Sequence, residues 1–224
     1  MGFLAENFRK ICDNVNPSEY LSHPPMYAQG KWQCANTCKE DLQVIGNFIR
    51  MRKPNVILEC GTFEARTTEY IFNLMRHYCP PLRRLLTIDV PRNIGHIDLE
   101  RWEPEEPEDP LYADAVKVRK HRISLMLRSE EVTLHYYEGL TRDYLGNILK
   151  EDKPDFVYQD ASHLQHLLEQ EWKIVESVEV KPGTVICFDD MKSNSFIEWV
   201  RPRLSDWDVF TNMRERGQLW LEKV

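Results

Sequence analysis

The chain is poor in glycine, in long apolar runs and in clustered basic residues. It has 9 glycines among 224 residues, and no apolar stretch approaches the roughly 20 residues that span a bilayer. Its start also lacks the charged, apolar and cleavage regions of a secretory signal. We therefore expect a cytoplasmic protein that has no membrane partner.

The charge distribution argues against nucleic acid as a partner. The formal net charge is -7, and basic residues are spread along the chain without forming a stripe. Binding to a phosphate backbone needs clustered Lys and Arg. We expect a small molecule as the partner instead.

Cysteine is present, but its placement does not indicate a disulfide framework. Cys60 and Cys187 fall in apolar, strand-like runs, where Cys behaves as a small hydrophobic residue. Cys34 and Cys38 form a C-x3-C pair with no second pair nearby, which is half of a zinc site.

Apolar runs bounded by Pro or Gly alternate with stretches whose apolar residues recur at helical spacing. This alternation is typical of an α/β fold, a doubly wound, mostly parallel sheet, here seven-stranded with a C-terminal antiparallel hairpin. The expected strands are 55–60, 85–89, 132–136, a run that ends at residue 160, 183–188, and a hairpin of 207–211 and 218–222; the expected helices are 1–12, 38–52, 67–77, 113–127, 142–150 and 164–178.

Two segments hold too many prolines for a regular element. Residues 14–37 are either a flap over the site or a packed irregular stretch, and residues 91–110 are an acidic, solvated insertion. We divide the chain into an N-terminal helix with an irregular flap, residues 1–37, and a ligand-binding domain, residues 38–224. The apolar side of residues 3–12 suggests an exposed face that makes a homodimer.

Acidic residues follow two neighbouring strands of the predicted sheet. Asp160 ends one strand, and Asp189 and Asp190 end the next. Ligands bind beyond the carboxyl ends of parallel strands, and converging carboxylates suit a hard metal ion. The alternative is that Asp189 and Asp190 cap the following helix. His163 is either a base beside the acids or a first-turn residue of its helix.

The turn after the first strand holds a single glycine, Gly61, before a predicted helix. Such a turn suits a nucleotide-like ligand, but the G-x-G-x-x-G fingerprint of dinucleotide binding is absent. Asp89 ends the second strand, where an acid accepts ribose hydroxyls.

Five segments, in this order and spacing, resemble class I S-adenosylmethionine-dependent methyltransferases. The similarity covers roughly residues 40–224 and is closest to the metal-dependent O-methyltransferases, both the catechol type and the type that methylates antibiotic sugars. The segments are Val56-Ile-Leu-Glu-Cys-Gly-Thr62, Thr87-Ile-Asp89, Tyr137-Glu-Gly139, Phe156-Val-Tyr-Gln-Asp160 and Lys181-Pro-Gly-Thr-Val-Ile-Cys-Phe-Asp-Asp190.

The resemblance implies a Rossmann-like methyltransferase fold and a role for each matched residue. One departure is Ala65, which stands where many relatives have the last glycine of the cofactor loop. The resemblance implies that the methionine end of the cofactor contacts Glu59, Gly61, Thr62 and Thr67, that Asp89 binds its ribose, and that Gly139 and Leu140 border its adenine. Asp160 would contact both the cofactor and Mg²⁺, and Asp189 and Asp190 would bind Mg²⁺ or another hard divalent cation. His163 would be the general base.

These observations predict a Mg²⁺-dependent O-methyltransferase. Its substrate would be a small polyhydroxylated molecule such as a sugar, a natural-product intermediate or a catechol, because the metal would contact two substrate oxygens. A metal-independent methyltransferase and a non-catalytic ligand-binding protein of the same fold are the alternatives.

Overall fold

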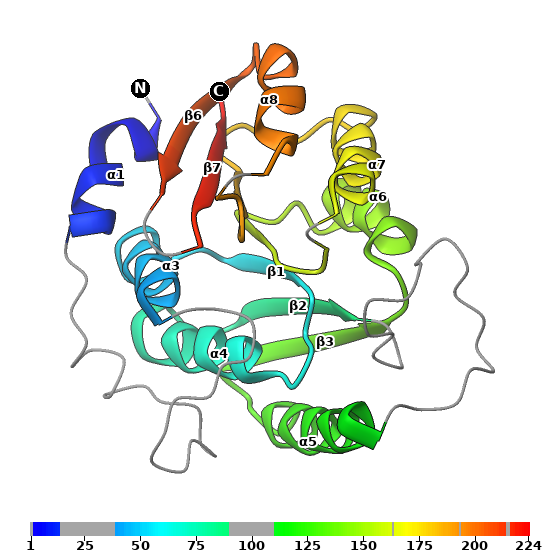
Figure 1. The fold of residues 1–224 in the computed structure, drawn as a ribbon. Coiled ribbons are helices and arrows are strands. Elements are labelled where there is room, and N and C mark those ends of the chain that lie inside the picture. Colours follow the sequence, from blue (N-terminus) through cyan, green and yellow to red (C-terminus); the bar gives the residue numbers. More distant parts are fainter. Residues whose placement is uncertain (1, 14–38, 90–109, 163, 193, 214–215) are drawn as a thin grey trace.

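The computed structural model describes residues 2–13, 39–89, 110–162, 164–192, 194–213 and 216–224 (Figure 1). Helices and strands alternate along the described chain, as the hydrophobic pattern predicts. The elements are α1 (Phe3–Asp13), α3 (Lys39–Arg52), β1 (Val56–Cys60), α4 (Arg66–Tyr78), β2 (Arg83–Asp89), α5 (Pro110–Met126), β3 (Val132–Glu138), α6 (Thr141–Glu151), β4 (Phe156–Gln159), α7 (Gln165–Glu176), β5 (Val185–Phe188), α8 (Phe196–Val200), the 3₁₀ turn η1 (Arg201–Arg203), β6 (Trp207–Asn212) and β7 (Gln218–Lys223).

The strands form one seven-stranded sheet in the order β3-β2-β1-β4-β5-β7-β6. Strands β1 to β5 are parallel, whereas β7 runs antiparallel to both β5 and β6. The direction of the strand order reverses at β1. Strands β2 and β3 lie on one side of β1, and β4 pairs with it on the other side. This is the predicted doubly wound sheet with a closing hairpin, and β1 marks the switch point where such sheets bind ligands.

Successive residues of each buried strand face opposite layers of helices. Ile57 of β1 belongs to the apolar cluster that includes residues of α1, α3, α4 and α5, whereas Leu58 belongs to the cluster that includes residues of α6, α7 and α8. Because side chains alternate along a strand, a strand covered on both faces is buried along its length and is mostly apolar. The five residues of β1 are all buried for this reason.

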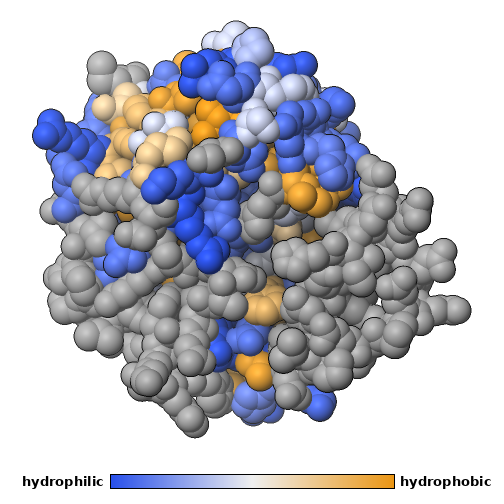
Figure 2. Space-filling view, viewed as in Figure 1, coloured by the Kyte–Doolittle hydropathy of each residue, from blue (hydrophilic) through white to orange (hydrophobic). Residues whose placement is uncertain are grey.

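The hypothesis that residues 3–12 expose an apolar face is wrong. Leu4 and Ile11 of α1 are fully buried, and the Phe8 ring lies 5.1 Å from the ring of Phe210 in β6 and 6.1 Å from that of Trp220 in β7. Figure 2 shows hydrophobic residues gathered on the part of this view where Figure 1 places α1, β6 and β7. The apolar side of α1 covers the chain's own hairpin, so it offers no argument for a dimer.

Smaller differences from the prediction have local causes. Pro110 begins α5 instead of ending the insertion, since proline fits the first turn of a helix, where its missing amide has no partner to lose. Cys60 and Cys187 are fully buried, as expected. The predictions for residues 14–37 and 91–109, including Cys34 and Cys38, lie outside the described residues. No helix among the described residues is long and apolar enough to cross a membrane.

Candidate active site

The turns that follow five strands meet at one edge of the sheet. Backbone hydrogen bonds continue the ladder past the strand ends: Gly61 N donates to Ile88 O, Asp160 N to Cys60 O, Asp189 N to Gln159 O, and Gly139 N to Asp89 O, all at 2.9–3.0 Å. The predicted residues at the ends of β1 to β5 therefore lie at one edge, where the parallel strands direct their carboxyl ends.

The turn after β1 passes so close to the turn after β4 that only glycine fits. Gly61 has φ +100°, and a Cβ atom there would lie 2.4 Å from the carbonyl oxygen of Asp160. Ala65, which precedes α4, is fully buried and also adopts a left-handed conformation, with φ 60°. That conformation costs alanine energy that glycine would not lose. The turn thus keeps the shape of a glycine loop with two non-glycine residues, Ala65 and Phe63 (φ 44°), in the left-handed region.

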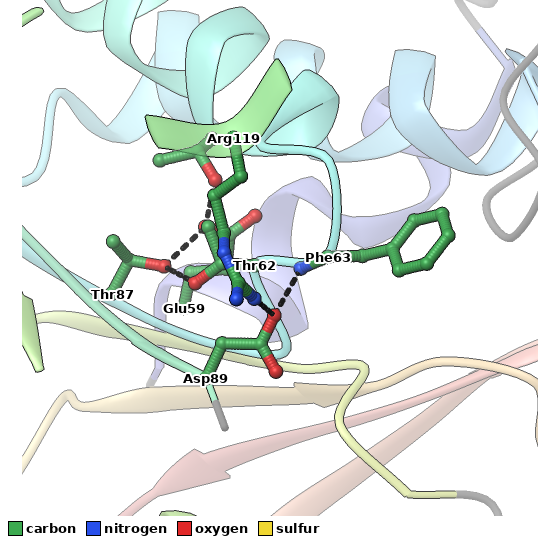
Figure 3. A network of polar contacts seen from close by, with 7 residues as sticks. Glu59, Thr62, Phe63, Thr87, Asp89 and Arg119 are labelled. Carbon is green, nitrogen blue, oxygen red and sulfur yellow. Dashed lines mark hydrogen bonds and ion pairs between the residues drawn. The ribbon is translucent and has the colours of Figure 1, made fainter. Parts of the chain in front are cut away.

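A buried group of hydroxyls surrounds Glu59 beneath this turn (Figure 3). Its Oε2 accepts hydrogen bonds from Thr68 Oγ1 at 2.5 Å and from Thr87 Oγ1 at 2.7 Å, and Thr87 Oγ1 lies 2.6 Å from Thr62 Oγ1. Burial raises the pKa of Glu59 from 4.5 to about 7, against the lowering effect of the two hydroxyl donors. Glu59 therefore ties the β1 turn to β2 and α4. Thr67, which the resemblance places at the methionine end of the cofactor, is also buried, and its neighbour Thr68 contacts Glu59.

Asp89 faces the β1 turn from the end of β2. Its Oδ2 accepts a hydrogen bond from Phe63 N at 2.5 Å and an ion pair from Arg119 Nη1 at 2.5 Å (Figure 3). The Arg119 side chain is 3% exposed. Arg119 was not among the predicted site residues. The pattern that could have indicated it is the spacing of Arg119 and Arg122, three residues apart on one face of α5. Arg122 pairs with buried Glu69.

Gly139 and Leu140 connect β3 to α6 beside Asp89. Gly139 has φ +155°, and a Cβ atom there would lie 2.6 Å from the ring of Tyr144. Leu140 is the N-cap residue of α6 and is partly exposed. The hydrogen bond from Gly139 N to Asp89 O places this turn beside Asp89, and the contact of Gly139 and Leu140 with an adenine ring stays a prediction.

The acids after β4 and β5 gather around one tyrosine. Tyr158 OH donates to Asp189 Oδ2 at 2.8 Å and also lies 3.4 Å from Asp160 Oδ2. Gln218 Nε2 of β7 donates to Asp189 Oδ1 at 3.2 Å. Asp189 is fully buried, and burial together with the charges of Asp160 and Asp41 raises its pKa well above its usual range. The alternative of a helix cap does not describe Asp189, whose carboxylate points into this polar cluster.

Asp190 takes a different direction from its neighbour. Its backbone is left-handed, with φ 57°, and its carboxylate pairs with Arg216, whose Nη1 lies 3.1 Å from Oδ2 and 3.5 Å from Oδ1. Burial acts to lower the pKa of Arg216, but the carboxylates of Asp190, Asp189 and Asp160 raise it above its usual value. Sequence analysis missed Arg216, Gln218, Tyr158 and Asp41 as members of this cluster.

The structure brings two of the three predicted metal ligands together and pairs the third with an arginine. Asp160 and Asp189 share Tyr158, while Asp190 is held by Arg216. No group of three or more His, Cys, Asp or Glu side chains is placed to hold a metal ion within the described part of the chain. His163 lies outside the described residues. The chemistry of the donor set fits a hard divalent cation, because two carboxylates, the fully buried Asp189 and the partly exposed Asp160, approach the same Tyr158 hydroxyl.

Sequence comparison finds no match among protein-family profiles or curated proteins. Solved structures do match. An S-adenosylhomocysteine-bound methyltransferase of Podospora anserina, PaMTH1, has a TM-score of 0.59 and 13% identity over 98% of this chain and 95% of its own. The O-methyltransferase TomG of Streptomyces achromogenes, solved with S-adenosylmethionine, has a TM-score of 0.56 and 16% identity over 98% of this chain and 96% of its own. The calicheamicin methyltransferase CalS11 has a TM-score of 0.56 and 16% identity over 97% of this chain and 90% of its own.

These matches span nearly the whole length of each protein, so they concern the complete fold. The chain has the Rossmann-like α/β architecture of nucleotide-type ligand binders. More narrowly, its fold is that of class I S-adenosylmethionine-dependent methyltransferases, O-methyltransferases among them.

Proposed function

We propose that this protein transfers a methyl group from S-adenosylmethionine to a hydroxyl of a small polyhydroxylated molecule, with the help of Mg²⁺ or another hard divalent cation. One observation carries the proposal: the glycine turn with Asp89 and the acid cluster with Asp189 lie at the same edge of a methyltransferase-type sheet. A cofactor site and a site for an acceptor hydroxyl are thus adjacent.

The cofactor half of the site would be formed by the turns after β1, β2 and β3. Gly61 and Thr62 would border the methionine end, Asp89 the ribose, and Gly139 and Leu140 the adenine. The ion pair from Arg119 and the Phe63 amide hold Asp89 Oδ2 in one orientation, so the carboxylate is preorganised. Such preorganisation reduces the entropy lost on binding.

The acid half of the site would bind and orient the acceptor. When bound, S-adenosylmethionine supplies an electrophilic methyl group, and a hard divalent cation lowers the pKa of a hydroxyl that it contacts. Asp160, Asp189 and Asp190 would hold the cation, and Tyr158 fixes the oxygens of the first two relative to each other. Alignment of acceptor and donor is worth about 7 to 11 kcal/mol in well-oriented reactions.

His163 is our proposed proton acceptor. It follows Asp160 by three residues, so it stays beside the acid edge in sequence. A neutral imidazole, with an ordinary pKa of about 6.5, accepts a proton near neutral pH. General-base help of this kind contributes about 10² to 10⁴-fold to the rate.

The acceptor class is supported by the similar structures. TomG is an O-methyltransferase involved in tomaymycin synthesis, and CalS11 is a calicheamicin methyltransferase. A metal-independent methyltransferase is the second candidate. The ion pair between Arg216 and Asp190 favours it, because a positive side chain already faces one of the three acids.

A calorimetric titration tests both candidates. S-adenosylhomocysteine is titrated into the full-length protein, and Mg²⁺ is then titrated into the saturated complex, with Asp189→Asn as the matched variant. Cofactor heat followed by metal heat that the variant loses supports the metal-dependent enzyme. Cofactor heat alone favours the metal-independent enzyme, and an absence of cofactor heat contradicts both.

A further inference from the structure

Arg216 pairs with Asp190, whose charge also helps to raise the pKa of the neighbouring Asp189. The guanidinium nitrogen Nη1 spans both oxygens of Asp190, at 3.1 and 3.5 Å. Asp160 and Asp189, in contrast, are linked through the Tyr158 hydroxyl. The two oxygens of Asp190 thus face an internal cation.

The backbone that carries Arg216 is fixed beside the acids. Lys192 N donates to Arg216 O at 2.8 Å, and Met191 N donates to Gly217 O at 2.9 Å, so these residues extend the pairing of β5 and β7 past the strand ends. Gly217 has φ +83°, and a Cβ atom there would lie 2.9 Å from Lys192 N. This close approach keeps the main chain of Arg216 next to Asp190.

The side chain of Arg216 is less constrained than its backbone. It is 43% exposed, while that of Asp190 is 17% exposed. A long side chain on a fixed backbone can leave its partner and reach solvent at little cost. Asp190 would then be released toward Asp160 and Asp189 with no movement of the sheet.

We propose that Arg216 is a gate on the metal site: its guanidinium and a divalent cation compete for the carboxylate of Asp190. This inference rests on the proposed metal-dependent function. Arg216 Nη1 lies within hydrogen-bond distance of both oxygens of Asp190, so it takes lone pairs that a metal ion would use, and the two positive charges would repel each other at contact distance. Arg216 therefore opposes metal binding unless it withdraws.

The test uses the full-length protein saturated with S-adenosylhomocysteine and titrated with Mn²⁺. Calorimetry and the electron paramagnetic resonance signal of free Mn²⁺ both give the dissociation constant without any turnover. Arg216→Gln removes the charge, Arg216→Lys keeps it, and Arg9→Gln makes the same change in net charge at a side chain that is 94% exposed in α1.

The proposal predicts that Arg216→Gln lowers the Mn²⁺ dissociation constant by about tenfold or more, since one competing charge is lost. Arg216→Lys should stay nearer the wild type, and Arg9→Gln should match it. An Arg216→Gln protein that binds Mn²⁺ no more tightly than the Arg9→Gln control overturns the gate, and so does the absence of Mn²⁺ binding in every variant.

Failure of the proposed function has a different signature. Without S-adenosylhomocysteine binding, the methyltransferase proposal itself fails. Cofactor binding with unchanged metal affinity in Arg216→Gln rejects only the gate.

Discussion

Glu59 is the residue whose ionisation most directly concerns the cofactor turn. Burial places its pKa at about 7 in the folded protein, above the ordinary value of 4.5, with the hydroxyls of Thr68 and Thr87 acting in the opposite direction. Its one close negative neighbour among the causes of the shift is Asp89. A carboxyl that must ionise in this environment destabilises the fold at neutral pH.

The sign of the resulting pH dependence follows from proton binding. Between pH values of about 4.5 and about 7 the folded protein holds this proton and the unfolded chain does not, so the free energy of unfolding falls as pH rises, by up to about 3 kcal/mol. We expect the free energy of unfolding of Glu59→Gln to fall less as pH rises, because the variant lacks this titrating carboxyl. Urea unfolding between about pH 5 and about pH 8 measures it.

The control for this prediction is Glu198→Gln, at a side chain that is 78% exposed. Its difference from the wild type should be nearly constant with pH. A constant difference for Glu59→Gln as well would contradict the raised pKa.

Gly61 also gives a prediction for a single residue, which concerns the backbone conformation of the β1 turn. Gly61→Ala would combine a left-handed backbone with a Cβ atom 2.4 Å from Asp160 O. We expect it to lower the free energy of unfolding by about 2 kcal/mol or more and to weaken S-adenosylhomocysteine binding. Gly146→Ala, inside α6, meets only a methyl group of Ile174 at 3.2 Å and should change stability by less than about 1 kcal/mol. Equal effects of the two variants would refute the role of the β1 turn.

Among the elements, α5 makes two ion pairs, one with the end of β2 and one with α4. Arg119 reaches Asp89 at the end of β2, and Arg122 reaches Glu69 in α4 at 3.2 Å. Both arginine side chains are 3% exposed. The two pairs have similar burial, but only the first includes a proposed cofactor ligand.

Arg119→Met and Arg122→Met form a matched pair on this helix. Each leaves a buried carboxylate without its cation, which costs about 3 to 5 kcal/mol. Only Arg119→Met should also weaken S-adenosylhomocysteine binding, by about tenfold, because Asp89 loses a charged hydrogen bond that orients it. Urea unfolding and calorimetry separate the two effects. Loss of cofactor affinity in both variants would mean that α5 acts through packing alone.

Element boundaries were largely predictable because they depend on short-range patterns. The apolar run of β1 and the helical spacing of α3 appear at the expected residues, with shifts of one residue at most. The sequence was less informative where an element starts with few apolar residues: β2 begins at Arg83, two residues earlier than predicted. Backbone pairing with β3, and not side-chain polarity, decides that boundary.

At the scale of the whole molecule, the two ends of the chain close the fold together. The carboxylate of Glu222 in β7 accepts hydrogen bonds from Phe3 N at 2.7 Å and Leu4 N at 2.6 Å, at the start of α1. A carboxylate suits the positive end of a helix. Within residues 1–37, the helix α1 packs on the main core, to which its Leu4 and Ile11 belong.

We therefore expect α1 to unfold with the rest of the protein. Glu222→Gln should lower the free energy of unfolding by about 1 to 2 kcal/mol, and the melting temperature by about 2 to 8 °C, in one transition seen equally by tryptophan fluorescence and far-ultraviolet circular dichroism. Glu198→Gln is again the exposed control. An unchanged transition in Glu222→Gln would show that α1 is only loosely attached.

The sequence by itself determined the α/β alternation, the strand ends and which polar residues stand there, because hydrophobic periodicity and turn residues act over a few positions. It therefore placed Asp89, Asp160 and Asp189 at one edge of a sheet. Only the tertiary structure decided which side chains complete that edge: Arg119 comes from α5, and Gln218 and Arg216 come from the region of the closing hairpin. Contacts between residues so far apart in the chain depend on the packing of whole elements, and no local pattern encodes them.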